Sequence, residues 1–230
     1  LATGDDPGPD PEPDTDAIVY LKMNNGTGTT ATDSSGNNIH GQLVSGAQWV
    51  TGKFDQGVRT DGTNDHIEIG HQSAINIGAQ NKDFTVGFWV NLQQGANGQW
   101  RGLAKKGNSW EERLFALYLP PDSNKLNFAT STTTSFNQSS ESNASLPVGA
   151  WKHVTYVKRG NNVELYFDGT LDSSFSFTGS TKPNTGKIYL GSAPGDAENA
   201  RAIFDEFKLF EKALTPAEIT NLPNDCLLYT

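Results

Sequence analysis

Cysteine is almost absent from this chain: Cys226 is the only one among 230 residues. An intrachain disulfide is therefore impossible. Because no Cys–His catalytic spacing accompanies it, we interpret Cys226 as an incidental thiol near the C-terminus rather than a nucleophile. Long apolar runs are missing as well, and none approaches the roughly 20 residues that a membrane-spanning helix needs. The sequence thus excludes a disulfide framework and gives no indication of a membrane partner.

An excess of positive charge is also missing. The chain has 17 Lys and Arg against 26 Asp and Glu, a formal net charge of -9. Six of these acids lie in residues 1–16 (LATGDDPGPDPEPDTD), so the rest of the chain is nearly balanced, with 20 acids against 17 bases. This charge pattern excludes a basic face for nucleic acid. Because proline alternates with acids in residues 1–16, we expect a solvated, semi-rigid linker there and one folded domain over residues 17–230.

Short alternating segments between turn residues make up most of the remaining sequence. In Phe84–Leu92, every second residue from Phe84 is apolar, while Thr85 and Asn91 belong to the other face. A period of two over short segments is typical of antiparallel strands. The same pattern recurs at Ala17–Met23, His40–Val44, His66–Ile69, Arg113–Leu119, Leu126–Thr130, Lys152–Val157, Val163–Phe167 and Lys187–Leu190. We therefore expect an all-β antiparallel sandwich.

One short helix is predicted near the C-terminus. Thr215 can cap it, Pro216 suits the first helical position, and Glu218 stands three residues after the cap. This spacing is a capping box, in which the side chains of the cap and of the third residue each accept a hydrogen bond from the other's backbone N–H.

The segment IFDEFKLFE, residues 203–211, carries three carboxylates and could belong to a glycosidase. Strand alternation places Asp205 on one face with Phe207 and Leu209, and Glu206 on the other. A glycosidase needs two carboxyl groups about 5 to 10 Å apart, which neighbours at i and i+2 on one face of a strand would supply, so this separation argues against a catalytic pair here. A carboxylate among apolar side chains must be compensated by hydrogen-bond donors, a basic partner or a metal. For Asp205 these three options remain open.

Several segments together resemble the laminin G-like, concanavalin A-like lectin/glucanase family. They are FTVGFWV (residues 84–90), WKHVTYV (151–157), VELYFDG (163–169) and IFDEFKLF followed by ALTPAEI (203–210 and 213–219). The resemblance runs in the family's order from about Ala17 to Leu222. It implies a jelly-roll sandwich of two antiparallel sheets.

The resemblance also implies a structural calcium ion. In such domains the Asp of the last-strand Asp-Glu pair, here Asp205, faces oxygen ligands from near the start of the domain. We carry this role over to Asp205, with Asn24, Asp33 and Asp61 as further expected ligands. Calcium takes six to eight oxygens, and these turns are rich in them.

Many members of this family are carbohydrate-binding modules of secreted polysaccharide-degrading enzymes, and others bind proteins. The catalytic members carry Glu-x-Asp-x-x-Glu on one strand, which this chain lacks. The resemblance therefore favours a non-catalytic, monomeric, extracellular module covalently linked to a catalytic domain and binding a polysaccharide. A glycosidase or lyase of the same fold, or a protein-binding adhesion module, remains an alternative.

The segment Gln93–Leu119 is the best candidate for ligand contact. Trp100 and Trp110 stand there in loop-like polar surroundings, where an indole can stack on a sugar ring. Four bases share the segment, and an arginine among them could hold a uronate or sulfate bidentately, so we expect an anionic glycan slightly more than a neutral one. The expected carbohydrate-binding residues are Trp100, Arg101, Lys105, Trp110, Arg113, His153 and Tyr166. The alternatives are that the two Trp pack over sandwich edges and that His153 is an ordinary sheet histidine.

Overall fold

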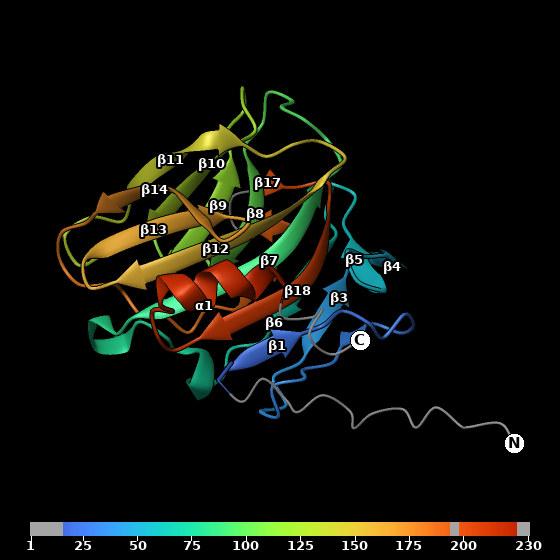
Figure 1. Ribbon diagram of the computed structural model, residues 1–230, viewed down its shortest axis with the longest axis horizontal. Helices are drawn as coiled ribbons and strands as arrows, with labels where there is room; N and C mark the ends of the chain where they lie inside the picture. Colours follow the sequence, from blue (N-terminus) through green and yellow to red (C-terminus); the bar gives the residue numbers. More distant parts are fainter. Residues whose placement is uncertain (1–15, 194–197, 225–230) are drawn as a thin grey trace, which may run out of the picture.

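The computed structural model describes residues 16–193 and 198–224. The expected linker, residues 1–16, lies outside the described residues apart from Asp16, and so does Cys226. The described residues fold into antiparallel sheets with one α-helix, which confirms the all-β sandwich expected from the sequence (Figure 1). None of the helices among these residues is long and apolar enough to cross a membrane.

The first sheet, sheet A, is built around the longest strands of the chain. In spatial order it contains β14 (Thr170–Ser176), β13 (Asn162–Phe167), β12 (Trp151–Arg159), β7 (Phe84–Leu92), β18 (Ala202–Phe210), β5 (Gln56–Arg59) and β4 (Gln48–Thr51), and β1 (Val19–Leu21) pairs with β18.

The second sheet, sheet B, packs against sheet A. In spatial order it contains β11 (Gln138–Ser145), β10 (Lys125–Thr130), β9 (Phe115–Leu119), β8 (Arg101–Lys106), β15 (Ile188–Leu190), β6 (His66–Ile69), β3 (Gly41–Val44) and β2 (Thr30–Ala31). Two short strands, β16 (Ser192–Ala193) and β17 (Glu198–Asn199), form a separate pair, and two 3₁₀ turns, η1 (Ser73–Ile75) and η2 (Ala79–Asn81), precede β7.

The hydrophobic core fills the space between the two sheets. Phe84 of sheet A stacks on Tyr156 at 5.9 Å between ring centroids and tilts against Phe115 of sheet B at 6.1 Å. All three are fully buried. Their alternation with outward-facing residues along β7, β12 and β9 is what gives each sheet one apolar face.

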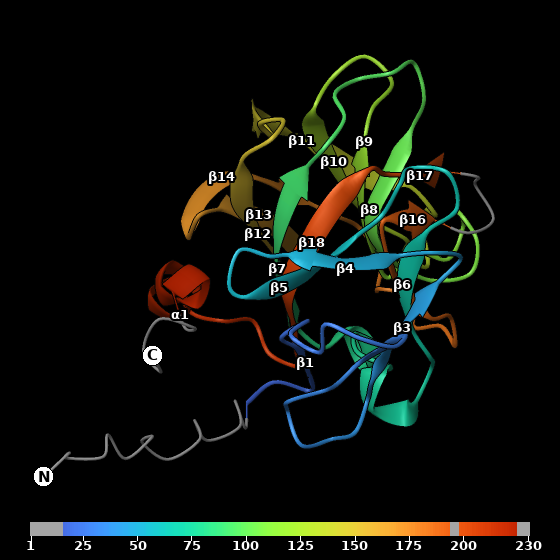
Figure 2. The same ribbon diagram turned by 90° about the vertical axis from the view of Figure 1, so that its right-hand side faces the viewer.

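Helix α1 (Pro216–Asn221) covers the outer face of sheet A (Figure 2). Thr215 Oγ1 accepts from the Glu218 backbone N–H, and the Glu218 side chain accepts from the Thr215 backbone N–H, so the capping box predicted from the sequence is confirmed. Ile219 packs with Tyr166 and Phe210 in a second apolar cluster on this side. The outer face of sheet A is therefore closed over this region.

A bulge in β18 changes which residues of IFDEFKLFE share a face. Asp205 pairs with Trp89, and the register then shifts before Lys208 because Glu206 adopts a left-handed conformation with φ 52°. Phe207 then points into the core. The expectation from simple alternation was thus wrong. Asp205 and Glu206 both lie on the outer side of sheet A, and Asp205 does not share a face with Phe207.

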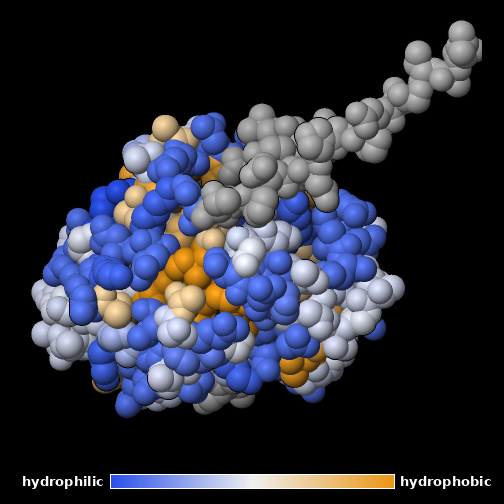
Figure 3. Space-filling model, turned by 90° about the horizontal axis from the view of Figure 1, so that it is seen from below, coloured by the Kyte–Doolittle hydropathy of each residue, from blue (hydrophilic) through white to orange (hydrophobic). Residues whose placement is uncertain are grey.

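The end of the sandwich seen from below in Figure 1 is hydrophilic over most of its area. Figure 3 shows a band of hydrophobic side chains near the centre of this face, between polar surroundings.

Candidate functional site

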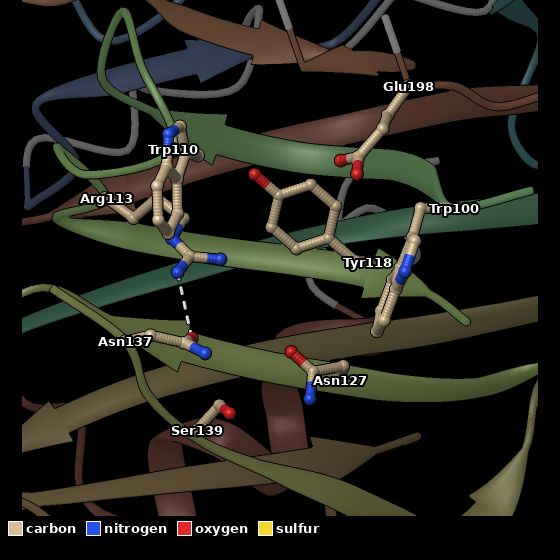
Figure 4. A pocket seen from close by; sticks show the side chains of 8 residues that line it. All are labelled: Trp100, Trp110, Arg113, Tyr118, Asn127, Asn137, Ser139 and Glu198. Atoms are coloured by element: carbon tan, nitrogen blue, oxygen red, sulfur yellow. Dashed lines mark hydrogen bonds between the residues drawn. The ribbon is translucent and has the colours of Figure 1, made fainter. Parts of the chain in front are cut away.

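A pocket of about 370 Å³ lies on the outer face of sheet B, where β8, β9 and β10 run side by side (Figure 4). The sequence suggested a loop-rich region over residues 93–119, but the structure places two strands of sheet B there, β8 and β9. The pocket is lined by Trp100, Trp110, Arg113, Tyr118, Asn127, Asn137, Ser139 and Glu198. Three of the seven residues expected to bind carbohydrate, Trp100, Trp110 and Arg113, therefore come together.

Aromatic rings form the walls of the pocket. Trp100 is 41% exposed and Trp110 is 48% exposed, whereas Tyr118 between them is buried. Trp100 meets the edge of Tyr118 at 6.3 Å and 88°, and Trp110 meets Phe136 at 4.5 Å and 79°. These contacts fix the two exposed indoles in place and leave a large part of each open. The alternative that both Trp are packed away over sandwich edges does not hold.

The floor of the pocket is polar. Asn127 pairs with Tyr118 across β10 and β9, while the neighbouring Leu126 and Phe128 point into the core. This alternation was readable in the sequence and could have identified Asn127 as an outward side chain. Glu198 comes from β17, far along the chain, and no local pattern could have placed it here.

Arg113 is held firmly at one end of the pocket. Its Nη2 donates to Asn137 Oδ1 at 2.8 Å and to the Phe136 carbonyl at 3.3 Å. Its guanidinium carbon lies 5.8 Å from the Tyr118 ring centre, a cation–π contact. Its Nε is buried and has no hydrogen-bond partner in the described structure. These contacts hold the Arg113 side chain in one orientation, in which it lines the pocket.

Arg101 does not contact the pocket, although it was expected to bind the ligand. The side chain is only 1% exposed and donates to four carbonyl oxygens. Its Nη1 reaches Gln94 and Gly95 at 3.1 and 2.8 Å, and its Nη2 reaches Pro120 and Ser123 at 3.1 and 2.9 Å. Arg101 therefore links the loop before β8 to the turn after β9. These hydrogen bonds fix the backbone next to Trp100 and Tyr118.

Lys105 was also expected to bind the ligand, but it is fully buried, as is its neighbour Lys106. Lys106 Nζ donates to the carbonyls of Gly186 at 2.8 Å and Asn184 at 3.3 Å. Burial lowers the pKa of Lys106 to about 8. Neither lysine is among the residues that line the pocket. The expectation for Lys105, drawn from local charge, is therefore corrected: the side chain is buried in β8, which pairs with β9 on one side and β15 on the other.

His153 and Tyr166 lie on the opposite side of the sandwich from the pocket. Both are buried on the outer face of sheet A, where His153 meets the edge of Trp89 at 5.3 Å and Tyr166 packs in the cluster with α1. Burial lowers the pKa of His153 to about 3. The two residues are therefore not part of this site, and His153 is an ordinary sheet histidine, as the alternative held.

The three acids among the four expected calcium ligands, Asp33, Asp61 and Asp205, do not form a cluster that could hold a metal ion. Within residues 16–193 and 198–224, no group of three or more His, Cys, Asp or Glu side chains could hold a metal ion. Asp61 lies in an exposed turn, where the Thr63 backbone N–H donates to it at 2.7 Å and lowers its pKa. Asn24 Oδ1 accepts from Gln56 N at 3.4 Å. The expected ligand set, which also includes Asn24, therefore stays a prediction.

The two buried acids of that set are satisfied by hydrogen bonds. Asp33 accepts backbone N–H groups from Tyr20, Ser35 and Ile39 at 2.9 to 3.0 Å, and the Ser35 hydroxyl at 2.8 Å. It holds together the loop that follows β2.

Asp205 accepts the N–H groups of Lys53 and Phe54 at 2.8 and 3.0 Å on one oxygen and that of Glu206 at 2.9 Å on the other. Burial raises the pKa of Asp205 to about 8, against the effect of these donors. The three N–H donors favour the carboxylate form and compensate its burial without a metal ion. These hydrogen bonds account for the burial of Asp205, and calcium binding at this residue stays a prediction.

Residues 61–220 match the model of the concanavalin A-like lectin/glucanases superfamily, laminin G type. The chain belongs to this family. None of the curated protein sequences matches the chain.

Solved structures share the fold at low sequence identity. The binding domain of Paraclostridial Mosquitocidal Protein 1 is similar with a TM-score of 0.74 and 18% identity, over 92% of this chain and 52% of that one. The chain thus spans about half of that domain. Domain 4 of AbnA, a GH43 extracellular arabinanase from Geobacillus stearothermophilus, in complex with arabinotriose, has a TM-score of 0.67 and 16% identity, over 90% of this chain and 97% of that one. Trypanosoma rangeli sialidase has a TM-score of 0.67 and 16% identity, over 92% and 33%. At these identities the likeness establishes the fold alone.

Proposed function

We propose that the pocket on sheet B binds a polysaccharide or oligosaccharide and that this chain is a non-catalytic carbohydrate-binding module. The observation that carries the proposal is the pair of exposed indoles, Trp100 and Trp110, held on either side of Tyr118. Sugar rings have apolar faces that stack on aromatic side chains and hydroxyl groups that pair with amides and hydroxyls. Asn127, Asn137 and Ser139 supply the latter along the floor.

The absence of catalysis is proposed from the lining of the pocket. Hydrolysis of a glycosidic bond normally needs two carboxyl groups about 5 to 10 Å apart on either side of the scissile bond. Among the lining residues of the described structure, Glu198 is the one carboxylate. Asp205 and Glu206 are adjacent, but both are buried on the outer side of sheet A, away from the pocket.

The biological setting of the module is part of the proposal. The acidic, proline-rich sequence of residues 1–16 is typical of linkers between domains, and domain 4 of an extracellular arabinanase shares the fold. We place the module outside the cell, as a monomer, joined to a polysaccharide-degrading enzyme. Binding would then raise the local concentration of that enzyme at its substrate.

Affinity electrophoresis across neutral, uronate and sulfated polysaccharides tests this proposal. We expect retardation by at least one polysaccharide, and loss of most of it in Trp100→Ala and Trp110→Ala. Leu171→Ala is the matched control, because Leu171 is an equally exposed apolar residue on β14 of the other sheet. Release of reducing ends or unsaturated products would instead indicate an enzyme. Retention on a protein partner with no glycan binding would indicate an adhesion module.

A further inference from the structure

We infer that the pocket binds an acidic glycan and that Arg113 holds the negatively charged group of that glycan, a carboxylate or a sulfate. This inference rests on the proposed function and names the class of its ligand. It follows from the charge of Arg113, from the orientation of its guanidinium and from the hydrogen-bond donors beside it.

The positive charge of Arg113 is buried and is not neutralised by an acid. The side chain is 8% exposed, and no Asp or Glu of the described residues forms an ion pair with it. Its partners are the Asn137 amide oxygen, the Phe136 carbonyl and the face of the Tyr118 ring, which stabilise a cation but carry no net charge. Because a buried charge costs free energy unless an opposite charge compensates it, an anionic group gains more beside Arg113 than a neutral group does.

One terminal nitrogen of the guanidinium is available to a ligand. Nη2 donates to Asn137 Oδ1 at 2.8 Å and to the Phe136 carbonyl at 3.3 Å, which uses both of its N–H groups. Figure 4 shows that the other terminal nitrogen, Nη1, points toward the middle of the pocket. No residue in the described part of the chain accepts a hydrogen bond from Nη1. A hydrogen bond from Nη1 to an anionic oxygen would be roughly twice as strong as one between neutral groups.

Neighbouring side chains can supply further donors to the same group. Asn137 uses its Oδ1 to accept from Arg113, so the amide NH₂ is the part of this side chain that remains to donate. Asn127 and Ser139 also line the pocket, and each can donate a hydrogen bond. The oxygens of a carboxylate or sulfate only accept hydrogen bonds, so this set of donors suits them.

The acid that lines the pocket lies at its other end. Figure 4 shows Glu198 near Trp100, whereas Arg113 lies near Trp110. Glu198 also interacts with other residues of the protein. We therefore expect an acidic sugar to bind with its anionic group toward Trp110 and with hydroxyl groups toward Trp100.

The experiment compares the acidic and neutral forms of one polysaccharide backbone, chosen as one that retards the protein in affinity electrophoresis. A uronate is compared with its methyl ester, a sulfated chain with its desulfated form, and a neutral chain with its carboxymethylated and sulfated derivatives. We expect an acidic form to bind about tenfold or more tightly than the neutral form, and this advantage to shrink at high salt because salt screens charges. The formal net charge of -9 opposes a polyanion, so such a preference must arise locally.

Variants of Arg113 test whether the preference comes from this residue. Arg113→Gln should lower the affinity for the acidic form to that for the neutral form, and Arg113→Lys, which keeps the charge, should retain part of the advantage. Lys82→Gln is the matched control, because Lys82 is a cation outside the pocket that pairs with Glu211 at the surface. This control should leave the advantage unchanged.

Equal or weaker affinity of the original protein for the acidic forms would overturn the inference while leaving the proposed function intact. An advantage of the acidic form that persists in Arg113→Gln would overturn it as well. Failure to bind any glycan, neutral or acidic, would instead contradict the proposed function itself.

Discussion

Trp100 and Trp110 flank opposite ends of strand β8, yet both face the same pocket, with Tyr118 between them (Figure 4). The two indoles therefore contact different parts of a bound chain, and neither touches the other among the ring contacts of the described residues. This arrangement suits an extended ligand better than a single small molecule, because each ring offers a separate platform.

Separate platforms should contribute independently to affinity. We expect Trp100→Ala and Trp110→Ala each to weaken binding of a long oligosaccharide about tenfold, and the double variant to lose about the sum of the two free energies, since sites without shared contacts are additive. Isothermal titration against oligosaccharides of increasing length checks this. For the shortest ligands that bind, one of the two substitutions should have no effect, and equal losses at every length would contradict the two-platform arrangement.

Arg101→Met should destabilise the protein and weaken ligand binding together. The substitution removes the buried guanidinium and leaves four carbonyl oxygens without their donor, so we expect a loss of about 3 kcal/mol or more of unfolding free energy. The loop that carries Trp100 should also loosen, and acrylamide should quench the Trp fluorescence of the folded variant more strongly. Arg201→Met, at an exposed arginine, is the control and should change stability by less than about 0.5 kcal/mol. Unchanged quenching in folded Arg101→Met would contradict the supporting role of Arg101.

The protein should lose stability in acid through His153. Its pKa is about 3 when folded and 6.5 when unfolded, so between these values the unfolded chain binds a proton that the native protein does not. The contribution of His153 to the free energy of unfolding is therefore fully present above pH 6.5. It decreases as the pH falls toward 3, by up to about 1.4 kcal/mol per pH unit. Urea unfolding between pH 4 and 7 measures this slope. His153→Gln should flatten this slope, and a slope that is unchanged in the variant would contradict the role of His153.

Calcium should not bind through Asp205. Because both of its oxygens accept backbone N–H groups, we expect the melting temperature to be the same with chelator as with millimolar calcium. A rise with calcium that is lost in Asp205→Asn would contradict this expectation and support the ion implied by the resemblance, since a ligand that binds only the native state stabilises it. Asp61→Asn, in an exposed turn, is the matched control.

Strands and the helix could be predicted from the sequence wherever a local pattern decides the structure. The capping box at Thr215 and the alternation of Phe84–Leu92 are such patterns, and both are confirmed. The alternation of residues 203–211 was misleading, because the left-handed conformation of Glu206 inserts a bulge that no residue type there announces. Glutamate is not a residue that favours positive φ, so tertiary packing decides the local conformation.

The candidate site was predictable in its aromatic part only. Trp100 and Trp110 stood out as large rings in polar surroundings, and they line the pocket. Arg101 and Lys105, which were expected to contact the ligand because they are close to the two Trp in the sequence, are buried by the neighbours of β8. Sheet order depends on long-range pairing, so neither this burial nor the arrival of Glu198 could be read from adjacent residues.

The covering of sheet A by α1 has a consequence for how the module can be attached. Asp16, where the described chain begins, is tied to Lys212 by a salt bridge of 2.7 Å, and the following Ala17 packs in the cluster under α1. The chain thus enters on the outer face of sheet A, whereas the pocket lies on the outer face of sheet B. If another domain precedes Asp16, as the proposed function holds, it joins on the side of the sandwich opposite the pocket, so it does not block contact between the pocket and an insoluble polysaccharide.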